Sequence, residues 1–65
     1  MTIGQKIAAL REQKGWTRYR LAKEAQTHQA TIGRIETGER QPSFDMVHRI
    51  AMCLGVSLAE FDAGK

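Results

Sequence analysis

The segment from Thr17 to Gly38 restricts the possible folds most, because it contains two short helical patterns separated by only a few residues. The first pattern carries the apolar pair Leu21 and Ala22. In the second, Ile32 and Ile35 lie three residues apart and form one narrow apolar stripe. The segment is therefore predicted to form two helices joined by a tight turn, the second of them more polar than packing requires.

Signals that begin and end helices recur along the chain, and no stretch shows the sustained alternation typical of strands. Thr2 and Gln5 form a capping box that begins a first helix, and Gly15 is its left-handed stop. The prediction is an all-α fold, a compact bundle of about five short helices in one domain over residues 1–65. The further helices are predicted over about 18–25 and 29–37, between Ser43 and Gly55, and from Ser57 onward.

The last two predicted helices have the clearest apolar faces. Ser57 with Glu60 is a second capping box, and Val56 with Phe61 is a hydrophobic staple. The preceding helix keeps an apolar period near 3.6 at positions expected in the core, namely Phe44, Val47, Ile50, Ala51 and Leu54.

The charge distribution favours a polyanionic partner. The net charge is +3. Residues 6–40 carry eight Lys or Arg against four Glu, whereas residues 41–65 carry more acids than bases. A basic half of this kind suits a nucleic acid, although charge alone fits an ordinary solvated surface equally well.

Cysteine, histidine and apolar content exclude several classes of protein. Cys53 is the only cysteine, so it cannot form an internal disulfide and is expected to pack as a small apolar residue in a reducing compartment. His28 and His48 are far apart, and no metal or other cofactor is predicted. The apolar runs are too short for a membrane span or a signal peptide, so an intracellular, cytoplasmic protein is expected.

One outward face of the helix over 29–37 has the composition of a DNA-reading surface. Gln29 and Arg34 stand beside the small residues Ala30 and Gly33. Short or hydrogen-bonding side chains let a helix approach a surface of donors and acceptors closely, and the major groove of DNA is such a surface. Sequence-specific binding of double-stranded DNA is therefore the predicted function.

Several short motifs occur together: Arg11, Trp16-Thr17, Leu21-Ala22, Gln29, Ile32, Arg34-Ile35-Glu36-Thr37-Gly38, Pro42-Ser43 and Leu54-Gly55-Val56-Ser57-Leu58. At this spacing the chain resembles the lambda-repressor-like, Cro/Xre-type helix-turn-helix family from about Ile3 to Phe61. The resemblance implies a helix-turn-helix over about 17–38, with a recognition helix over 29–37 in the major groove and the preceding helix across the backbone.

The resemblance also implies individual roles. Arg34 suits guanine and Gln29 suits adenine, while Ala30 can pack on a thymine methyl and Gly33 lets the helix lie close. A partly buried ion pair between Arg11 and Glu36 is implied as well. Phosphate contacts are implied for Thr17, Arg18, Tyr19, Thr27, His28, Thr37, Gly38 and Arg40.

Three features are unusual for this pattern. The turn before the recognition helix commonly carries Gly where this chain has Gln26, which costs roughly 1 kcal/mol if the turn needs a positive φ. His28 is a poor N-cap, and Thr27 is the alternative. Arg18 and Arg20 stand in the first turn of their helix, where the dipole favours acids and a docked anion would reverse the penalty.

The leading hypothesis is a small transcriptional repressor that binds a near-palindromic operator as a homodimer. Candidates for the dimer interface are Met52, Leu58 and Phe61, with core packing as the alternative for Phe61. The second hypothesis is an antitoxin or adaptor whose main role is to bind a protein partner. No paired carboxylates, activated nucleophile or phosphate-cradling glycine loop suggests an enzyme.

Overall fold

Helices make up all the regular structure in the computed structural model, which describes residues 2–61. The predicted all-α bundle is confirmed, but the expected five α-helices are four α-helices and a final 3₁₀ helix. The elements are α1 (Ile3–Gln13), α2 (Arg18–Glu24), α3 (Gln29–Thr37), α4 (Phe44–Leu54) and η1 (Leu58–Phe61).

Within the described residues, the last element is a single 3₁₀ turn rather than an α-helix. The amide of Glu60 donates to the carbonyl of Ser57 at 3.1 Å, the i→i+3 bond of a 3₁₀ helix. No side-chain capping box forms at Ser57 within the described residues. One turn is nevertheless enough to bring Phe61 into the core, where it is 4% exposed.

Local capping accounts for most helix boundaries. The capping box of Thr2 and Gln5 is present at the start of α1. Thr17 and Ser43 accept hydrogen bonds from amides in the first turns of α2 and α4. Helix α3 ends at Gly38, which has a left-handed φ of 86°. Helix α2 ends one residue before the predicted limit.

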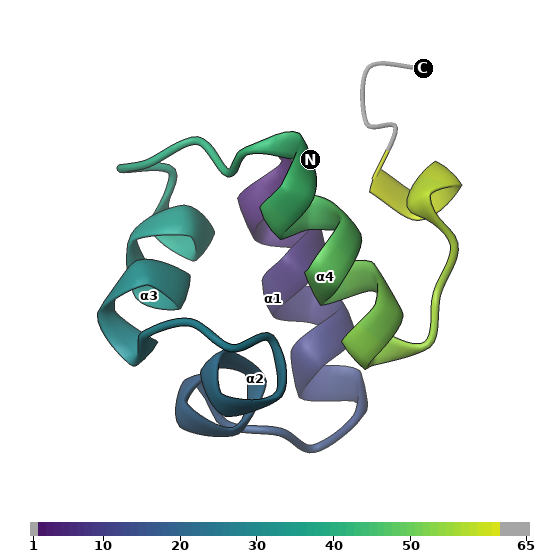
Figure 1. Cartoon of the computed structure of the whole chain (residues 1–65), viewed down its shortest axis with the longest axis horizontal. Coiled ribbons are helices and arrows are strands. Elements are labelled where there is room, and N and C mark those ends of the chain that lie inside the picture. The colour runs from purple at the N-terminus through teal and green to yellow at the C-terminus, as the bar shows by residue number, and fades with distance from the viewer. Residues whose placement is uncertain (1, 62–65) are drawn as a thin grey trace.

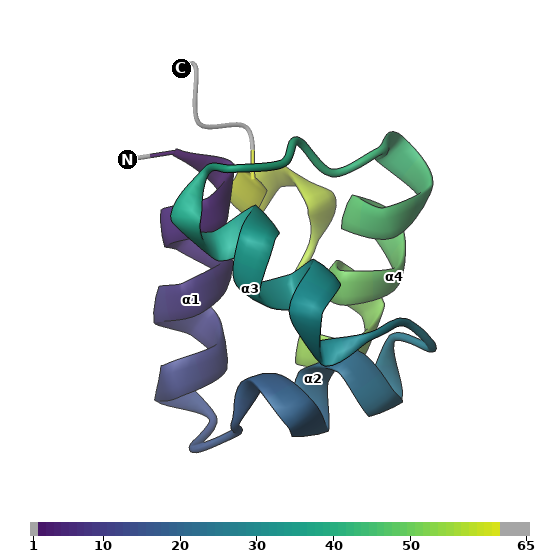
Figure 2. The same cartoon turned by 90° about the vertical axis from the view of Figure 1, so that its left-hand side faces the viewer.

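The helices surround one apolar core. Figure 1 shows α1 and α4 beside each other, and Figure 2 shows α3 facing the viewer between them, with α2 crossing beneath. Both views leave α3 with one face directed away from the other helices. The largest fully enclosed side chains come from all four α-helices, namely Ile7, Leu21, Ile32, Ile35 and Ile50.

Phe44 was expected in the core, and that prediction is wrong. Its side chain is 76% exposed, whereas Val47, Ile50 and Leu54 on the same helix are buried. Phe44 is the first residue of α4, and helical side chains tilt toward the N-terminus, so its ring lies beyond the end of the buried stripe. There it stacks on His48, with ring centroids 6.5 Å apart.

Gly4 sets how closely α1 approaches the end of α3. A Cβ at Gly4 would collide with the backbone carbonyl oxygen of Ile35 and would lie 3.0 Å from that of Glu36. Backbone atoms cannot rotate aside as a flexible side chain can, so the contact requires glycine. This position was not singled out from the sequence.

Replacing Gly4 with Ala should therefore destabilise the fold by ~1–3 kcal/mol, the usual cost of overpacking. Gly33→Ala is the matched control, because a Cβ there would make only an ordinary van der Waals contact, 3.4 Å from the side chain of Arg18. The control should be neutral or stabilising by up to ~1 kcal/mol, since Ala favours helix over Gly. Urea denaturation followed by circular dichroism measures both, and equal effects would contradict the close packing of α1 on α3.

The turn between α2 and α3 requires a left-handed residue, and Gln26 fills that position with a φ of 59°. The cost considered from the sequence is therefore present in the fold. Gln26→Gly should stabilise the protein by roughly 1 kcal/mol, because glycine adopts this conformation without a Cβ clash. Thermal melting of the two proteins tests this, and a lower melting temperature for the glycine variant would show that the Gln26 side chain stabilises the turn.

Candidate nucleic-acid interface

The turn between α2 and α3 is held by the backbone rather than by a side-chain cap. The amide of Thr27 donates to the carbonyl of Ala22 at 2.9 Å. His28 is the N-cap of α3 and makes no side-chain capping hydrogen bond, so the alternative with Thr27 as the cap is wrong. The first amides of α3 are consequently left without a side-chain acceptor from the cap, as an anion-binding helix terminus requires.

Helix α3 separates into a buried stripe and an outward face. Ile32, Ile35 and Glu36 are buried. Gln29, Ala30 and Arg34 are exposed, and Gly33 on the same face is half-buried. No carboxylate of the residues from 2 to 61 forms an ion pair with Arg34. The four residues predicted to read bases thus share one face, with the guanidinium of Arg34 unpaired within this part of the chain.

Six of the eight predicted phosphate-binding residues fall into two groups, and the other two, Thr17 and Arg18, lie at the start of α2. The first group borders the turn, where a hollow of about 370 Å³ is lined by Tyr19, Ala22, Lys23, Thr27, His28 and Gln29. Lys23 was not included among the sequence-based candidates. Its position could have been inferred only by knowing that α2 and α3 form the two walls of one hollow.

The second group follows the C-terminus of α3. Thr37, Gly38 and Arg40 are all exposed. The hydroxyl of Thr37 donates to the carbonyl of Arg34 at 3.2 Å, so its proton is already used within the helix. Thr17, in turn, accepts a hydrogen bond from the amide of Arg20 at 3.0 Å, which leaves its hydroxyl proton free to donate.

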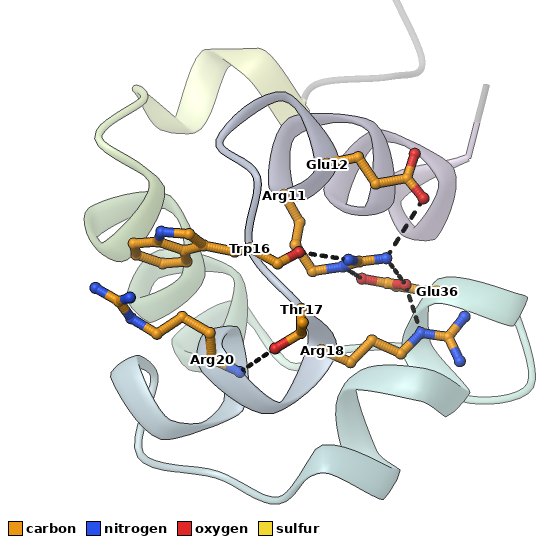
Figure 3. Close-up of polar contacts among 7 residues, drawn as sticks. All are labelled: Arg11, Glu12, Trp16, Thr17, Arg18, Arg20 and Glu36. Carbon is orange, nitrogen blue, oxygen red and sulfur yellow. Dashed lines mark hydrogen bonds and ion pairs between the residues drawn. The ribbon is translucent and has the colours of Figure 1, made fainter.

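The buried carboxylate of Glu36, on the inner side of α3, binds two arginines (Figure 3). The Glu36 side chain is only 2% exposed. Arg11 donates from Nε to Oε2 of Glu36 at 2.7 Å and from Nη2 to Oε1 at 3.1 Å. Arg18 donates from Nε to Oε1 at 2.9 Å. The expected Arg11–Glu36 pair is therefore present, and Arg18 is a second cationic partner that the sequence did not indicate.

This cluster joins three helices. Arg11 comes from α1, Arg18 from α2 and Glu36 from α3 (Figure 3). Arg11 also donates from Nη1 to the carbonyl of Trp16 at 2.7 Å, which ties down the segment between α1 and α2. The hydrogen bonds to Glu36 raise the pKa of Arg11 further above its ordinary value, against the opposing effect of burial. The guanidinium of Arg11 therefore stays charged throughout the physiological pH range.

The two arginines at the positive end of α2 each have a carboxylate partner. Arg18 pairs with Glu36, and Arg20 pairs with Glu24 at 2.9 Å. The guanidinium of Arg20 also lies 4.6 Å from the centroid of the Trp16 ring. These contacts offset the unfavourable helix dipole without a bound anion.

Other kinds of site receive little support within residues 2–61. No cluster of three potential metal ligands is present there. None of the described helices has the length and apolar character needed to cross a membrane. Cys53 is half-buried against the core, and burial, with a smaller effect of Glu24, raises the pKa of its thiol.

The geometry defines a small all-α protein whose second and third helices form a helix-turn-helix with one face of the third helix open. Comparison with known proteins gives the family: residues 7–61 match the family model described as Helix-turn-helix. The chain belongs to this helix-turn-helix family, and the resemblance inferred from its motifs is confirmed. Proteins of this kind bind DNA with the second helix of the motif in the major groove.

Among the proteins similar to this chain are a phage repressor and a restriction-modification controller. It is 30% identical over 59 residues to the immunity repressor protein of Bacillus phage phi105, an alignment that covers 91% of this chain but 41% of that relative. It also resembles the crystal structure of the restriction-modification controller protein C.AhdI from Aeromonas hydrophila, with a TM-score of 0.88 and 27% identity. That match covers 91% of this chain and 89% of the controller protein.

Removing the buried carboxylate tests the cluster. Glu36→Ala should destabilise the protein by ~3–5 kcal/mol, because it leaves the buried Arg11 cation without its partner. Glu24→Ala is the matched control, since it breaks the exposed Arg20–Glu24 pair, which is worth about 0–1 kcal/mol. Thermal melting compares the two, and a Glu36→Ala melting temperature within a few degrees of the parent would contradict a structural role for the pair.

Proposed function

We propose that this protein is a transcriptional repressor that reads a specific double-stranded DNA operator through the outward face of α3. The observation that carries the proposal is the division of α3: Ile32 and Ile35 fix one side in the core, and Gln29 and Arg34 project from the other. The similarity to a phage immunity repressor and to a restriction-modification controller protein supports a regulatory role.

Base recognition would follow from the chemistry of the exposed face. The unpaired fork of Arg34 matches the two acceptors that guanine presents in the major groove, and the amide of Gln29 matches the donor and acceptor of adenine. Ala30 offers a methyl group for contact with thymine. These side chains stand on a helix whose opposite side is packed, so they are held in a fixed register.

Phosphate binding would hold the helix in that register. Near the turn, Tyr19, Lys23 and His28 surround the free amides at the start of α3. At the other end of the helix, the amide of Gly38 and the side chain of Arg40 lie on the exposed loop. Contacts on both sides of the base-reading face would fix its orientation without adding sequence preference.

A homodimer would extend the DNA site to two half-sites ~34 Å apart. The exposed side of α4 is the surface we propose for it. Met52 is 69% exposed and continues a row with His48 and Phe44 at helical spacing. Asp45 and Arg49 border this row, so two copies related by a two-fold axis would present complementary charges to each other.

The structure changes the set of dimer candidates. Phe61 belongs to the core, and Leu58 is half-buried against it. Leu58 and Phe44 line a hollow of about 280 Å³ near the start of α4. The exposed apolar side chains of α4, Phe44 and Met52, also favour the second candidate function, an antitoxin or adaptor. Such a surface could bind a different protein instead of a second copy.

Selection of bound duplexes from a random pool, followed by salt titration, tests the proposal. The expected product is an inverted repeat bound at least ~10³-fold more tightly than a scrambled duplex. The affinity for both duplexes should fall steeply as salt rises. A single unrepeated site would contradict the dimer. No enrichment, with weak binding to every duplex, would contradict the repressor and direct the search to a protein partner.

Arg34 provides the test of base reading. Arg34→Ala should lower the affinity for the selected operator by ~1–3 kcal/mol and relax the preference at one position of each half-site. Lys14→Ala is the matched control, because Lys14 is exposed at the end of α1, outside the proposed DNA and dimer surfaces, and its replacement removes the same charge. Equal losses with unchanged base preference would show that Arg34 contributes charge alone.

A further inference from the structure

Helix α3 contains a glycine that helix stability alone does not favour. Gly33 lies in the middle of α3, where Gly is less favourable than Ala by ~0.8–1.0 kcal/mol. The Arg18 side chain of α2 lies directly against this position, since a Cβ there would be in van der Waals contact with it, 3.4 Å from Nη1 and 3.9 Å from Cζ. The surface above Gly33 is therefore covered by the guanidinium of Arg18.

That guanidinium has a defined position. Its Nε donates to Glu36 at 2.9 Å, and Glu36 is fixed in turn by two hydrogen bonds from Arg11. Figure 3 shows the two terminal nitrogens of Arg18 turned away from the carboxylate. Within residues 2–61 these two nitrogens have no hydrogen-bond acceptor, and the side chain is 44% exposed.

We propose that Arg18 is a base-reading residue, supplied by α2 to the face of α3 at the position that Gly33 leaves empty. The inference rests on the proposed DNA-binding function and assigns one more specificity-determining side chain to the same site. It replaces the phosphate contact expected for Arg18 from the sequence.

The chemistry of the fork specifies its target. Because Nε is bound to Glu36, the pair of donors that remains is Nη1 and Nη2, the end of the fork. Two parallel donors match O6 and N7 of guanine in the major groove. A side chain that is already held by a buried carboxylate loses little rotamer entropy on binding, which increases the contribution of each contact.

A phosphate contact would predict a different behaviour. A phosphate accepts hydrogen bonds from any positioned cation, so lysine would substitute for arginine with little change in sequence preference. A guanine read by a two-donor fork would discriminate sharply between the two residues, because a lysine presents a point charge.

The experiment repeats the duplex selection with the parent, Arg18→Lys and the control Arg20→Lys. Arg20 also occupies the first turn of α2 and pairs with a glutamate, but it lies on the Trp16 side (Figure 3). The result expected for Arg18→Lys is loss of preference at one guanine in each half-site, with binding of the parent's operator weakened ~5–150-fold. The salt dependence should remain that of the parent. Arg20→Lys should retain the parent's sequence preference and affinity.

This comparison requires folded variants, which circular dichroism verifies. Arg18→Lys should fold, because Glu36 keeps its hydrogen bonds with Arg11 when Arg18 is replaced. Should Arg18→Lys unfold, Arg18→Gln retains a donor for Glu36 and should lose the same guanine preference. Unchanged preference at every position in a folded variant would overturn the proposal and restore the phosphate contact. Failure of the parent to select any sequence would overturn the DNA-reading function itself, a result distinct from a negative result for Arg18 alone.

Discussion

The carboxylate of Glu36 is the constraint on which the arrangement of the first three helices depends. It is almost fully enclosed, and it accepts hydrogen bonds from one arginine of α1 and one of α2. A buried carboxylate is tolerable only when its lone pairs are satisfied, so Arg11 and Arg18 must come to it. The close contact at Gly4 lies against the backbone carbonyls of Ile35 and of Glu36 itself. Together they determine where α3 lies and which of its faces remains open.

The sequence predicted well those features that depend on residues close together in the chain, above all the helix boundaries. The side chains of Thr2 and Ser43 accept hydrogen bonds from amides one turn away, and Gly38 ends α3 through its left-handed backbone. The helix boundaries could therefore be predicted within about one residue. Phe44 fails for the complementary reason. It fits the apolar period of α4, but periodicity gives only direction around the helix axis and not whether a neighbour covers that end of the helix.

The candidate site divides in the same way. Gln29 and Arg34 could be assigned to the outward face of α3 because the two isoleucines of that helix define the inward one. Arg18 could not be assigned, since the resemblance already paired Glu36 with Arg11, and nothing in the spacing indicates that one carboxylate binds two cations. Gly4 and Gly33 are likewise interpretable only with the opposing helix in position.

The turn of the motif is the part of the fold with the weakest local preferences. Gln26 adopts a left-handed conformation without glycine, and His28 begins α3 without a side-chain cap. Both conformations hold because the helices on either side are fixed by buried residues such as Leu21 and Ile32. Because His28 does not cap α3, the first amides of the helix remain free beside the hollow that Tyr19 and His28 line. A stronger cap at position 28 would occupy those amides, so local stability and anion binding compete at this helix terminus.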